Sequence, residues 1–227
     1  MSYKFCPHCG KAFVEVEEPR TVPAILQKKE FITWEQVKAL SVKDEASTLF
    51  DVGDEIHETL KNGEEVVFVV VGKDMYRPGD VIFSLKDCLA ESQRMNDCAT
   101  NEGGWNASKM RKYLHETVLP LLPDDLRACI VPRILDGESN MLWLFSEMEV
   151  FGEQSWTEHD PDCGKQMPYF MRRGNRVKGL GKDGAANSWW ERSPDTSNTT
   201  GFCGVGNNGG AVTYASYSHG VAFGFCV

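Results

Sequence analysis

A long polar segment between two strongly apolar ones leaves the end of this chain few ways to fold. In residues 195–220, more than half of the positions are Gly, Asn, Ser or Thr, and Asp195 is the only formally charged residue. Trp189 and Trp190 lie just before this segment, and the apolar residues 221–227 follow it. Because the middle cannot form a core while both ends can, we expect ordered surface loops that are anchored at each end.

The last seven residues predict a strand. Large apolar side chains alternate with small ones over 221–227, which is the period of two that a strand produces. We expect the face with small side chains to let another layer of the protein approach closely. Residues 202–205 predict a second short strand, in the middle of the polar segment.

The composition of the polar segment is typical of recognition loops. Tyr, Ser, Gly and Asn are enriched in antibody loops, where Tyr supplies rigid contact area and the small polar residues supply hydrogen bonds. The alternative is a turn-rich hairpin that is merely exposed to solvent. We expect ten residues on one exposed surface, because short loops between neighbouring strands would share one end of a sheet. These residues are Asn187, Glu191, Asp195, Asn198, Asn207, Asn208, Thr213, Tyr214, Ser216 and Tyr217.

The remainder of residues 31–227 predicts an α+β domain. Two helices are expected between residues 105 and 130, and the Asn-Gly pair at 62–63 predicts a hairpin turn. The other expected elements are a helix over 34–46, strands over 55–60, 65–71, 81–85 and 141–146, and a short helical turn over 146–152.

Charge and hydropathy exclude two classes of partner. The formal net charge is −9, whereas a protein that holds nucleic acid by its phosphates needs a basic face. No apolar run approaches the roughly 18 residues of a membrane-spanning helix. The first residues also lack an apolar signal region, so we expect a protein that begins in the cytoplasm or is exported without a classical signal.

The segment 1–30 contains a zinc-knuckle pattern and a linker. Cys6-Pro7-His8-Cys9-Gly10 would bring two thiolates within reach of one metal ion, with Gly10 permitting the tight bend. A closed zinc site needs four ligands, and no second Cys-x-x-Cys follows; the nearest substitutes are His159 and Cys163. Cys6 and Cys9 are therefore candidate ligands of a structural zinc, with a metal-free knuckle as the alternative; no other cofactor is expected.

Three runs of residues carry a family resemblance. They are Trp189-Trp190-Glu191-Arg192-Ser193-Pro194, Gly201-Phe202-Cys203-Gly204-Val205 and Gly220-Val221-Ala222-Phe223-Gly224-Phe225. They resemble the end of a large bacterial and phage family whose members read Trp-Trp-Leu-Arg-Ser-Pro and finish near Gly-Val-x-Pro-Ala-Phe. That family is similar to the C-type-lectin-like variable proteins of diversity-generating retroelements. This chain departs from the pattern at Glu191, where Leu is usual, and at Ala222 and Gly224.

The resemblance implies a C-type-lectin-like fold, which formylglycine-generating enzymes share, with two helices and a small mixed or antiparallel sheet. It also implies a diversified ligand-binding protein of a phage, prophage or bacterium, with a variable segment at about 187–218. The partner would be a protein or cell-surface ligand, and the protein itself would be cytoplasmic or part of a phage virion. The alternative is a binding module of a phage particle with fixed specificity.

An enzyme is not expected. Formylglycine-generating enzymes depend on a reactive cysteine pair, for which Cys203 and Cys226 are the only candidates near the C-terminal motifs. Cys226 alternates with large core residues, which favours a packing role. The chain contains no nucleophile elbow, phosphate loop or His-Glu-x-x-His motif. It also lacks the residue clusters with which animal lectins bind calcium.

Overall fold

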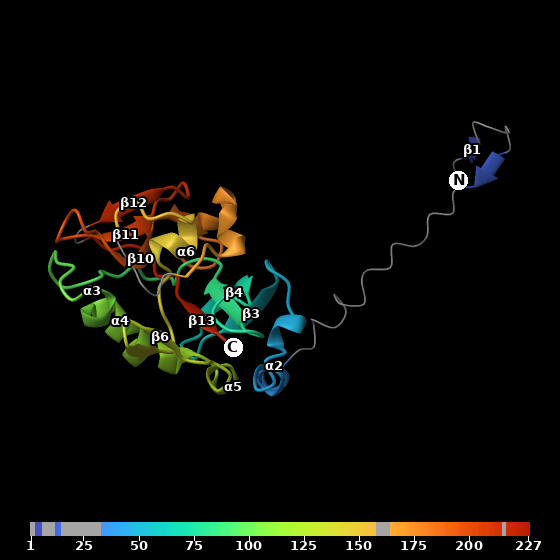
Figure 1. Ribbon diagram of the computed structural model, residues 1–227, viewed down its shortest axis with the longest axis horizontal. Coiled ribbons are helices and arrows are strands. Elements are labelled where there is room, and N and C mark those ends of the chain that lie inside the picture. The colour runs from blue at the N-terminus through green and yellow to red at the C-terminus, as the bar shows by residue number, and fades with distance from the viewer. Residues whose placement is uncertain (1–2, 6–11, 15–32, 158–163, 215–216) are drawn as a thin grey trace. The chain divides into compact units, whose positions relative to one another are not determined.

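A computed structural model of the chain describes most of the larger of its two units. The described residues are 3–5, 12–14, 33–157, 164–214 and 217–227. The two units are Met1–Thr33 and Trp34–Val227. In the first, β1 (Tyr3–Phe5) pairs antiparallel with β2 (Ala12–Val14). The second is a mixed α+β unit with several small antiparallel sheets (Figure 1).

A four-stranded antiparallel sheet lies at the centre of this unit, in the order β13-β5-β4-β3. Its strands are β3 (Glu55–Thr59), β4 (Glu65–Lys73), β5 (Val81–Leu85) and β13 (Gly224–Cys226). The hairpin between β3 and β4 turns at Gly63, whose φ of 87° suits glycine. The predicted hairpin and the strand over 81–85 are confirmed, whereas the strand expected over 221–227 is confined to β13.

Aromatic rings fill the core against this sheet. Phe83 and Phe225 stack with centroids 5.2 Å apart, and Phe68 meets Phe225 edge-on at 5.0 Å. A Cβ added at Gly224 would lie 2.5 Å from the Phe145 ring. The small side of the last strand therefore does admit another layer, as its alternation predicts.

The first helix is shorter than predicted. α2 (Trp34–Ser41) is followed by a turn and by the 3-10 helix η1 (Ala46–Thr48), so the expected helix over 34–46 is wrong at its end. The chain leaves the helical path at Asp44, whose φ is 55°. A single residue in this left-handed conformation is a common way to end a helix.

The region between residues 105 and 130 is helical, as predicted, but in three stretches rather than two. Its segments are α3 (Gly104–Ala107), α4 (Lys109–Tyr113), the π-helical turn η2 (Leu114–Val118), η3 (Leu119–Leu121) and α5 (Asp124–Arg127). The Ser108 hydroxyl caps α4 by accepting a hydrogen bond from Arg111 N at 3.1 Å. Asp124 and Asp125 stand in the first turn of α5, where the helix dipole favours acids.

The predicted helical turn over 146–152 is α6 (Glu147–Phe151). Ser146 accepts a hydrogen bond from Glu149 N at 3.2 Å, and the Glu149 carboxylate accepts one from Ser146 N at 2.9 Å, which completes a capping box. Gly152 ends the helix with a φ of 78°.

The strand predicted over 141–146 is wrong. Only Trp143 pairs there, in an isolated backbone bridge with Gly224. Trp143 and Leu144 are buried, so the apolar run reflects burial rather than a strand. A short apolar run cannot distinguish these two situations.

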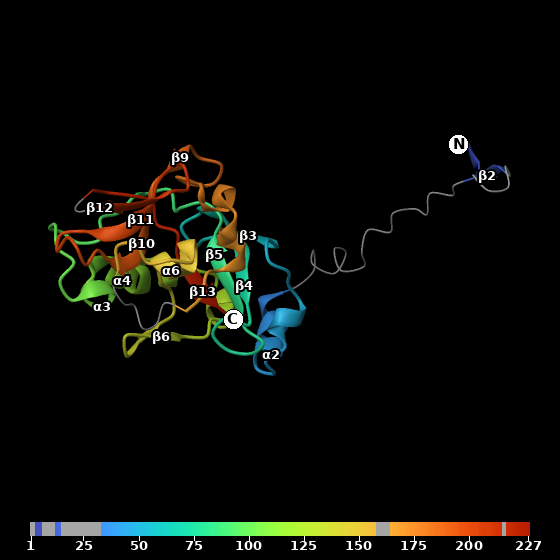
Figure 2. The same cartoon turned by 45° about the horizontal axis from the view of Figure 1, so that its top comes forward.

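A three-stranded antiparallel sheet forms a separate layer. It contains β10 (Trp189–Pro194), β11 (Phe202–Val205) and β12 (Ala211–Tyr214) in that order, and β12 is its outermost strand in Figures 1 and 2. Trp189 and Trp190 are fully buried, as predicted. The strand expected over 202–205 is confirmed as β11.

Short elements complete the unit. They are β6 (Arg133–Leu135), β7 (Glu138–Asn140), β8 (Lys178–Gly179), β9 (Ala186–Asn187), and the 3-10 helices η4 (Pro168–Met171) and η5 (Arg173–Arg176). β6 pairs with β7 and β8 pairs with β9. Among the described residues, no helix is both long and apolar enough to span a membrane.

Candidate functional site

Three aromatic side chains gather where the chain leaves β12. The rings of Tyr214 and His219 lie 3.8 Å apart, and the rings of Tyr217 and His219 lie 6.4 Å apart. Tyr217 is 69% exposed, whereas Tyr214 and His219 are half-buried. We call these three residues the aromatic patch. The buried Trp190 ring meets Tyr214 edge-on at 5.8 Å and His219 at 4.9 Å, so the patch rests on the core.

Backbone and side-chain hydrogen bonds hold the patch in place. Gln93 and His219 exchange two backbone hydrogen bonds, and Trp190 Nε1 donates to the Gln93 carbonyl at 2.8 Å. The Tyr214 hydroxyl donates to Ser188 Oγ at 2.8 Å. A Cβ added at Gly204 would lie 3.2 Å from the Tyr214 ring, so glycine lets this ring lie against β11. The Tyr214 and His219 rings are thus held in place by the protein itself.

His219 contributes a neutral ring to the patch. Burial lowers the pKa of His219, so the imidazole is uncharged near neutral pH. Its Nε2 atom is buried and has no hydrogen-bond partner. This uncharged ring packs against Tyr214 at an interplanar angle of 36° and is half-buried, and sequence reasoning did not select it.

The loop over 195–201 is built by its own side chains and by Asn101. Asp195 accepts hydrogen bonds from Ser197 N and Oγ at 2.9 and 2.7 Å, and Asn198 accepts from Thr200 N and Oγ1 at 3.1 and 2.7 Å. Such side-chain-to-backbone bonds are those of turns. Asp195 and Asn198 therefore shape this loop.

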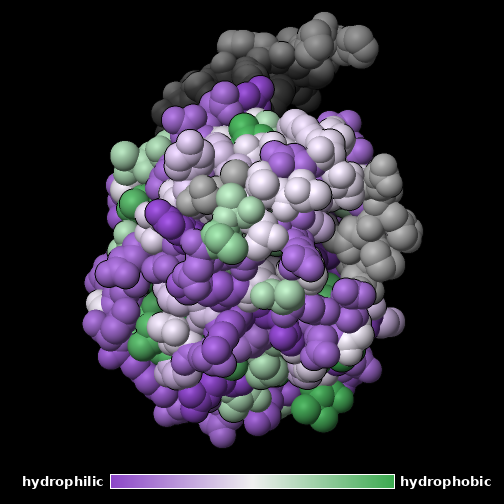
Figure 3. Space-filling view, turned by 90° about the vertical axis from the view of Figure 1, so that its left-hand side faces the viewer, coloured by the Kyte–Doolittle hydropathy of each residue, from purple (hydrophilic) through white to green (hydrophobic). Residues whose placement is uncertain are grey.

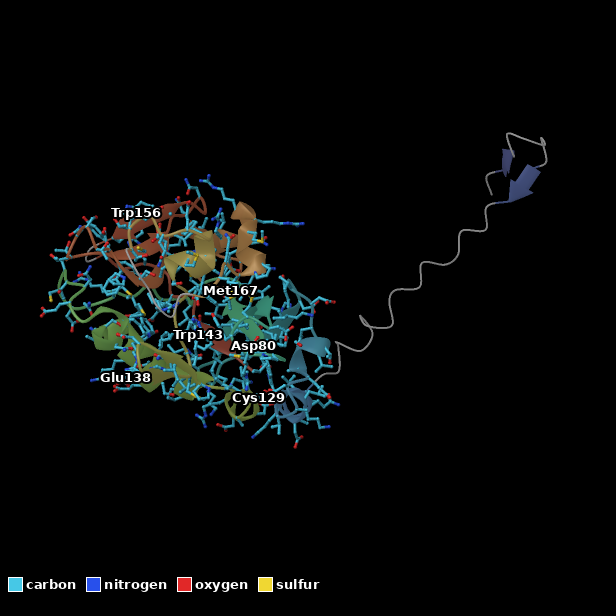
Figure 4. The ribbon with its side chains drawn as sticks, viewed as in Figure 1. Asp80, Cys129, Glu138, Trp143, Trp156 and Met167 are labelled. Atoms are coloured by element: carbon cyan, nitrogen blue, oxygen red, sulfur yellow. The ribbon has the colours of Figure 1, made fainter. Side chains whose placement is uncertain are left out.

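Asn101 holds the same loop from outside. Its Nδ2 atom donates to the carbonyls of Asp195, Asn198 and Gly201 at 2.8, 3.0 and 2.8 Å. The Thr196 hydroxyl also donates to the Trp156 carbonyl at 2.9 Å, and Figure 4 shows Trp156 beside this sheet. Sequence reasoning missed Asn101, because nothing local indicates a bond across about 100 residues.

The ten predicted residues do not all emerge at one end of the sheet. Pro194 and Tyr214 pair with Phe202, so the loop 195–201 begins at that end. The loop 206–210, with the exposed Asn207 and Asn208, lies at the opposite end. Successive hairpins of an antiparallel meander turn at alternate ends, so the expectation that these loops share one end is wrong.

Two of the ten residues are buried, which corrects the prediction that they are exposed. Glu191 is 0% and Asp195 3% exposed. Glu191 lies in β10, a strand that is covered on both faces. In such a strand both sets of alternating side chains are buried, so alternation in the sequence does not indicate which residues are exposed. Asn187 and Thr213 are half-buried, and Ser216 lies outside the described residues.

The burial of Glu191 has an electrostatic consequence. Neither carboxyl oxygen has a hydrogen-bond partner. Burial, followed by the negative charge of Glu147, raises the pKa of Glu191 well above its ordinary value, although Arg192 acts in the opposite direction. The side chain is therefore held as a neutral acid inside the protein.

A buried ion-pair network lies next to it. The Glu149 carboxylate accepts from Arg133 Nη1 at 2.7 Å and from Arg192 Nη1 at 2.6 Å. The Tyr76 hydroxyl also donates to it, at 2.9 Å. Burial opposes ionisation, but the two guanidinium groups and the Ser146 amide together lower the pKa of Glu149. This network ties α6 to β6 and β10, and we assign it a structural role.

The two cysteines considered for catalysis are both buried, one in each main sheet. Cys203 lies in β11 and Cys226 in β13. Burial raises the pKa of Cys226 to about 12 and raises that of Cys203 well above its usual range. A catalytic thiol needs a lowered pKa and access to substrate, and neither cysteine has these properties.

Metal ligands do not cluster in the part of the chain that the structure describes. No group of three or more His, Cys, Asp or Glu side chains there could hold a metal ion. Cys6, Cys9, His159 and Cys163 lie outside the described residues, so the zinc site stays a prediction.

Comparisons with known proteins identify a family. No curated protein and no solved structure matches the chain. A family model described as a domain of unknown function, DUF6273, matches residues 79–227, which include β5, α3 to α6, the three-stranded sheet and β13. This match covers more than half of the chain, and the chain therefore belongs to the DUF6273 family.

Proposed function

We propose that this protein binds a ligand through the aromatic patch and catalyses no reaction. The observation that carries this proposal is the exposure of Tyr217 beside two ordered rings. Figure 3 shows mainly hydrophilic residues with small, separate hydrophobic spots on the side that is at the left in Figure 1, so a broad apolar interface is not available there. A few rigid aromatic anchors are sufficient for specific binding.

The fold that we propose for residues 31–227 is C-type-lectin-like. Two observations support it. The Trp189-Trp190 motif and the last strand resemble those of the family named above, and together they enclose the surface loops of the polar segment. In such a domain the C-terminal loops would meet a protein or a cell-surface ligand. The net charge of −9 argues against nucleic acid as that ligand.

We further propose that the recognition segment is of the diversified kind found in variable proteins of retroelements. The structure limits which residues can take part, because Glu191 and Asp195 are buried. The exposed or half-buried residues that remain are Asn187, Asn198, Asn207, Asn208, Thr213, Tyr214 and Tyr217. A protein of fixed specificity in a phage particle is the competing proposal, and a template repeat beside the gene would distinguish the two.

A formylglycine-generating type of oxidoreductase is the less favoured alternative. Its chemistry needs two reactive cysteines at one site. Cys203 and Cys226 lie in separate sheets with raised pKa values, which weighs against it.

The proposal is tested by screening the purified chain against displayed peptides, proteins and glycans, and then measuring the affinity of any ligand found. Tyr217→Ala should weaken binding by about 2 kcal/mol, or roughly 30-fold, and leave thermal stability nearly unchanged. Ile134→Ala is the matched control, because it truncates another exposed apolar side chain, in β6. Equal affinities of Tyr217→Ala and wild type, or the absence of any ligand, would refute the proposal.

A further inference from the structure

The three-stranded sheet has one covered edge and one open edge. At the covered edge, Trp190 N in β10 donates to the Gly220 carbonyl at 3.1 Å, and Arg192 N donates to the Phe145 carbonyl at 2.9 Å. At the open edge, β12 pairs only with β11, and no other described residue bonds to its backbone. A strand in this position presents a row of free N–H and C=O groups.

The edges of the four-stranded sheet are protected in ways that β12 is not. Backbone bridges from Val131 and Trp143 cover β13. β3, at the other edge, carries Glu55, His57 and Glu58, and charged side chains discourage another strand from pairing. β12 reads Ala-Val-Thr-Tyr, which is uncharged and favours extended structure. All four of its residues are partly exposed.

A basic surface lies beside the first residue of β12. Arg173 Nε donates to the Asn208 carbonyl at 3.0 Å, and a Cβ added at Gly210 would lie 3.3 Å from Arg173 Nη2. Gly210 directly precedes β12. Arg172 stands next to Arg173 in the chain, and both are exposed. This local positive charge contrasts with the net charge of −9 of the whole chain.

Exposed apolar side chains accompany the arginines. Val177 is 38% exposed, and its Cγ2 atom would lie 3.2 Å from a Cβ added at Gly209. Met171, which ends η4, is 67% exposed. One end of the β12 edge is therefore basic and partly apolar. Tyr214 ends the strand at the other end, and its ring lies over β11 against Trp190 and His219.

We propose that β12 binds an extended peptide segment of a partner protein as an added strand, with an acidic residue of that peptide beside Arg173. Main-chain hydrogen bonds to β12 would supply affinity, and the two ends of the edge would supply specificity. This inference rests on the proposed function, because it names the class of ligand for the same surface. A second copy of β12 would be a poorer occupant, since residues 206–214 contain no acidic side chain to meet Arg173.

The test begins with a displayed library of linear peptides selected on the whole chain. We expect the selected peptides to combine β-branched or aromatic residues with an acidic residue near one end. The best peptide is then synthesised in three forms: unmodified, N-methylated at every odd position, and N-methylated at every even position. An added strand uses alternate N–H groups, so one methylated form should lose at least about tenfold in affinity while the other keeps it.

Hydrogen exchange and two variants locate the contact. Amide exchange over 211–214 should slow when the peptide binds. Arg173→Gln should lower the affinity for the acidic peptide at least about fivefold. It should not change the affinity for a version of the peptide in which the acid is replaced by its amide. Ala211→Glu should weaken binding, because it places a negative charge on the edge where the peptide carries its acid, whereas Thr59→Glu, on the already charged edge of β3, should not.

The outcomes separate this inference from the proposed function. Suppose that Tyr217→Ala weakens the binding of a ligand, but that this ligand does not slow amide exchange over 211–214 and its affinity does not depend on which positions are methylated. Strand addition is then overturned, and the aromatic patch remains the binding site. A library that yields no peptide, or that favours basic peptides, also overturns the inference. Self-association of the chain that a charge in β12 abolishes would show that a second copy occupies this edge instead.

Discussion

Replacing Glu191 with Leu should stabilise the protein, and the gain should increase with pH. Its carboxyl group is fully buried without a hydrogen-bond partner, and its pKa is raised well above the ordinary value of 4.5. Because this acid stays protonated above pH 4.5 in the folded protein, the free energy of unfolding decreases by about 1.4 kcal/mol for each pH unit between 4.5 and the raised pKa.

The sign follows from proton binding. Because the pKa of Glu191 is higher in the folded protein than in the unfolded chain, the folded protein holds more protons above pH 4.5. The stability of the wild type therefore decreases as the pH rises from 4.5 to 7. In Glu191→Leu that decrease disappears, and the unpaired polar group is also removed, which contributes about 1 kcal/mol at any pH.

Thermal unfolding of both proteins between pH 4 and pH 7.5 measures this difference. Glu191→Leu should unfold a few degrees higher than wild type at pH 4, and the difference should grow by about 3–6 °C for each pH unit above 4.5 until the raised pKa is reached. Glu191→Gln is the control, because it keeps a polar side chain of the same shape and removes only the pH dependence. A gain that does not change with pH, or a lower melting temperature for Glu191→Leu at pH 7, would refute the reasoning.

Three other changes test the structure elsewhere. Trp189→Ala should lower the free energy of unfolding by about 3–5 kcal/mol in a denaturant titration, because a fully buried indole leaves a cavity. Asn101→Ala should cost about 1–3 kcal/mol and speed amide exchange over 195–201, since three carbonyls lose one common donor; unchanged exchange there would contradict this. Burial lowers the pKa of Lys178 to about 8, so the unfolded chain binds more protons between pH 8 and pH 10.5. Wild type should therefore gain up to about 3 kcal/mol relative to Lys178→Met over that interval, and parallel stability curves would exclude this.

Local elements could be predicted because short-range interactions determine them. The Asn-Gly pair at 62–63 sets the hairpin between β3 and β4 by backbone conformation alone. Ser146 and Glu149 close their capping box within one turn, and Gly152 ends the same helix. The burial of Trp189 and of the last strand could also be predicted, because large apolar groups must leave water wherever the core lies.

Tertiary structure alone decided which polar residues reach the surface. Glu191 and Asp195 occur among typical loop residues, yet they are buried because β10 is covered on both faces and because the loop 195–201 folds onto Asn101. Strand order placed the loop of Asn207 and Asn208 at the far end of the sheet. His219 is held in the aromatic patch by its backbone pairing with Gln93 and by ring contacts with Trp190 and Tyr214. In each case the determining contact joins residues that are distant in the chain or depends on the order of the strands, and neither leaves a periodic or local signal in the sequence.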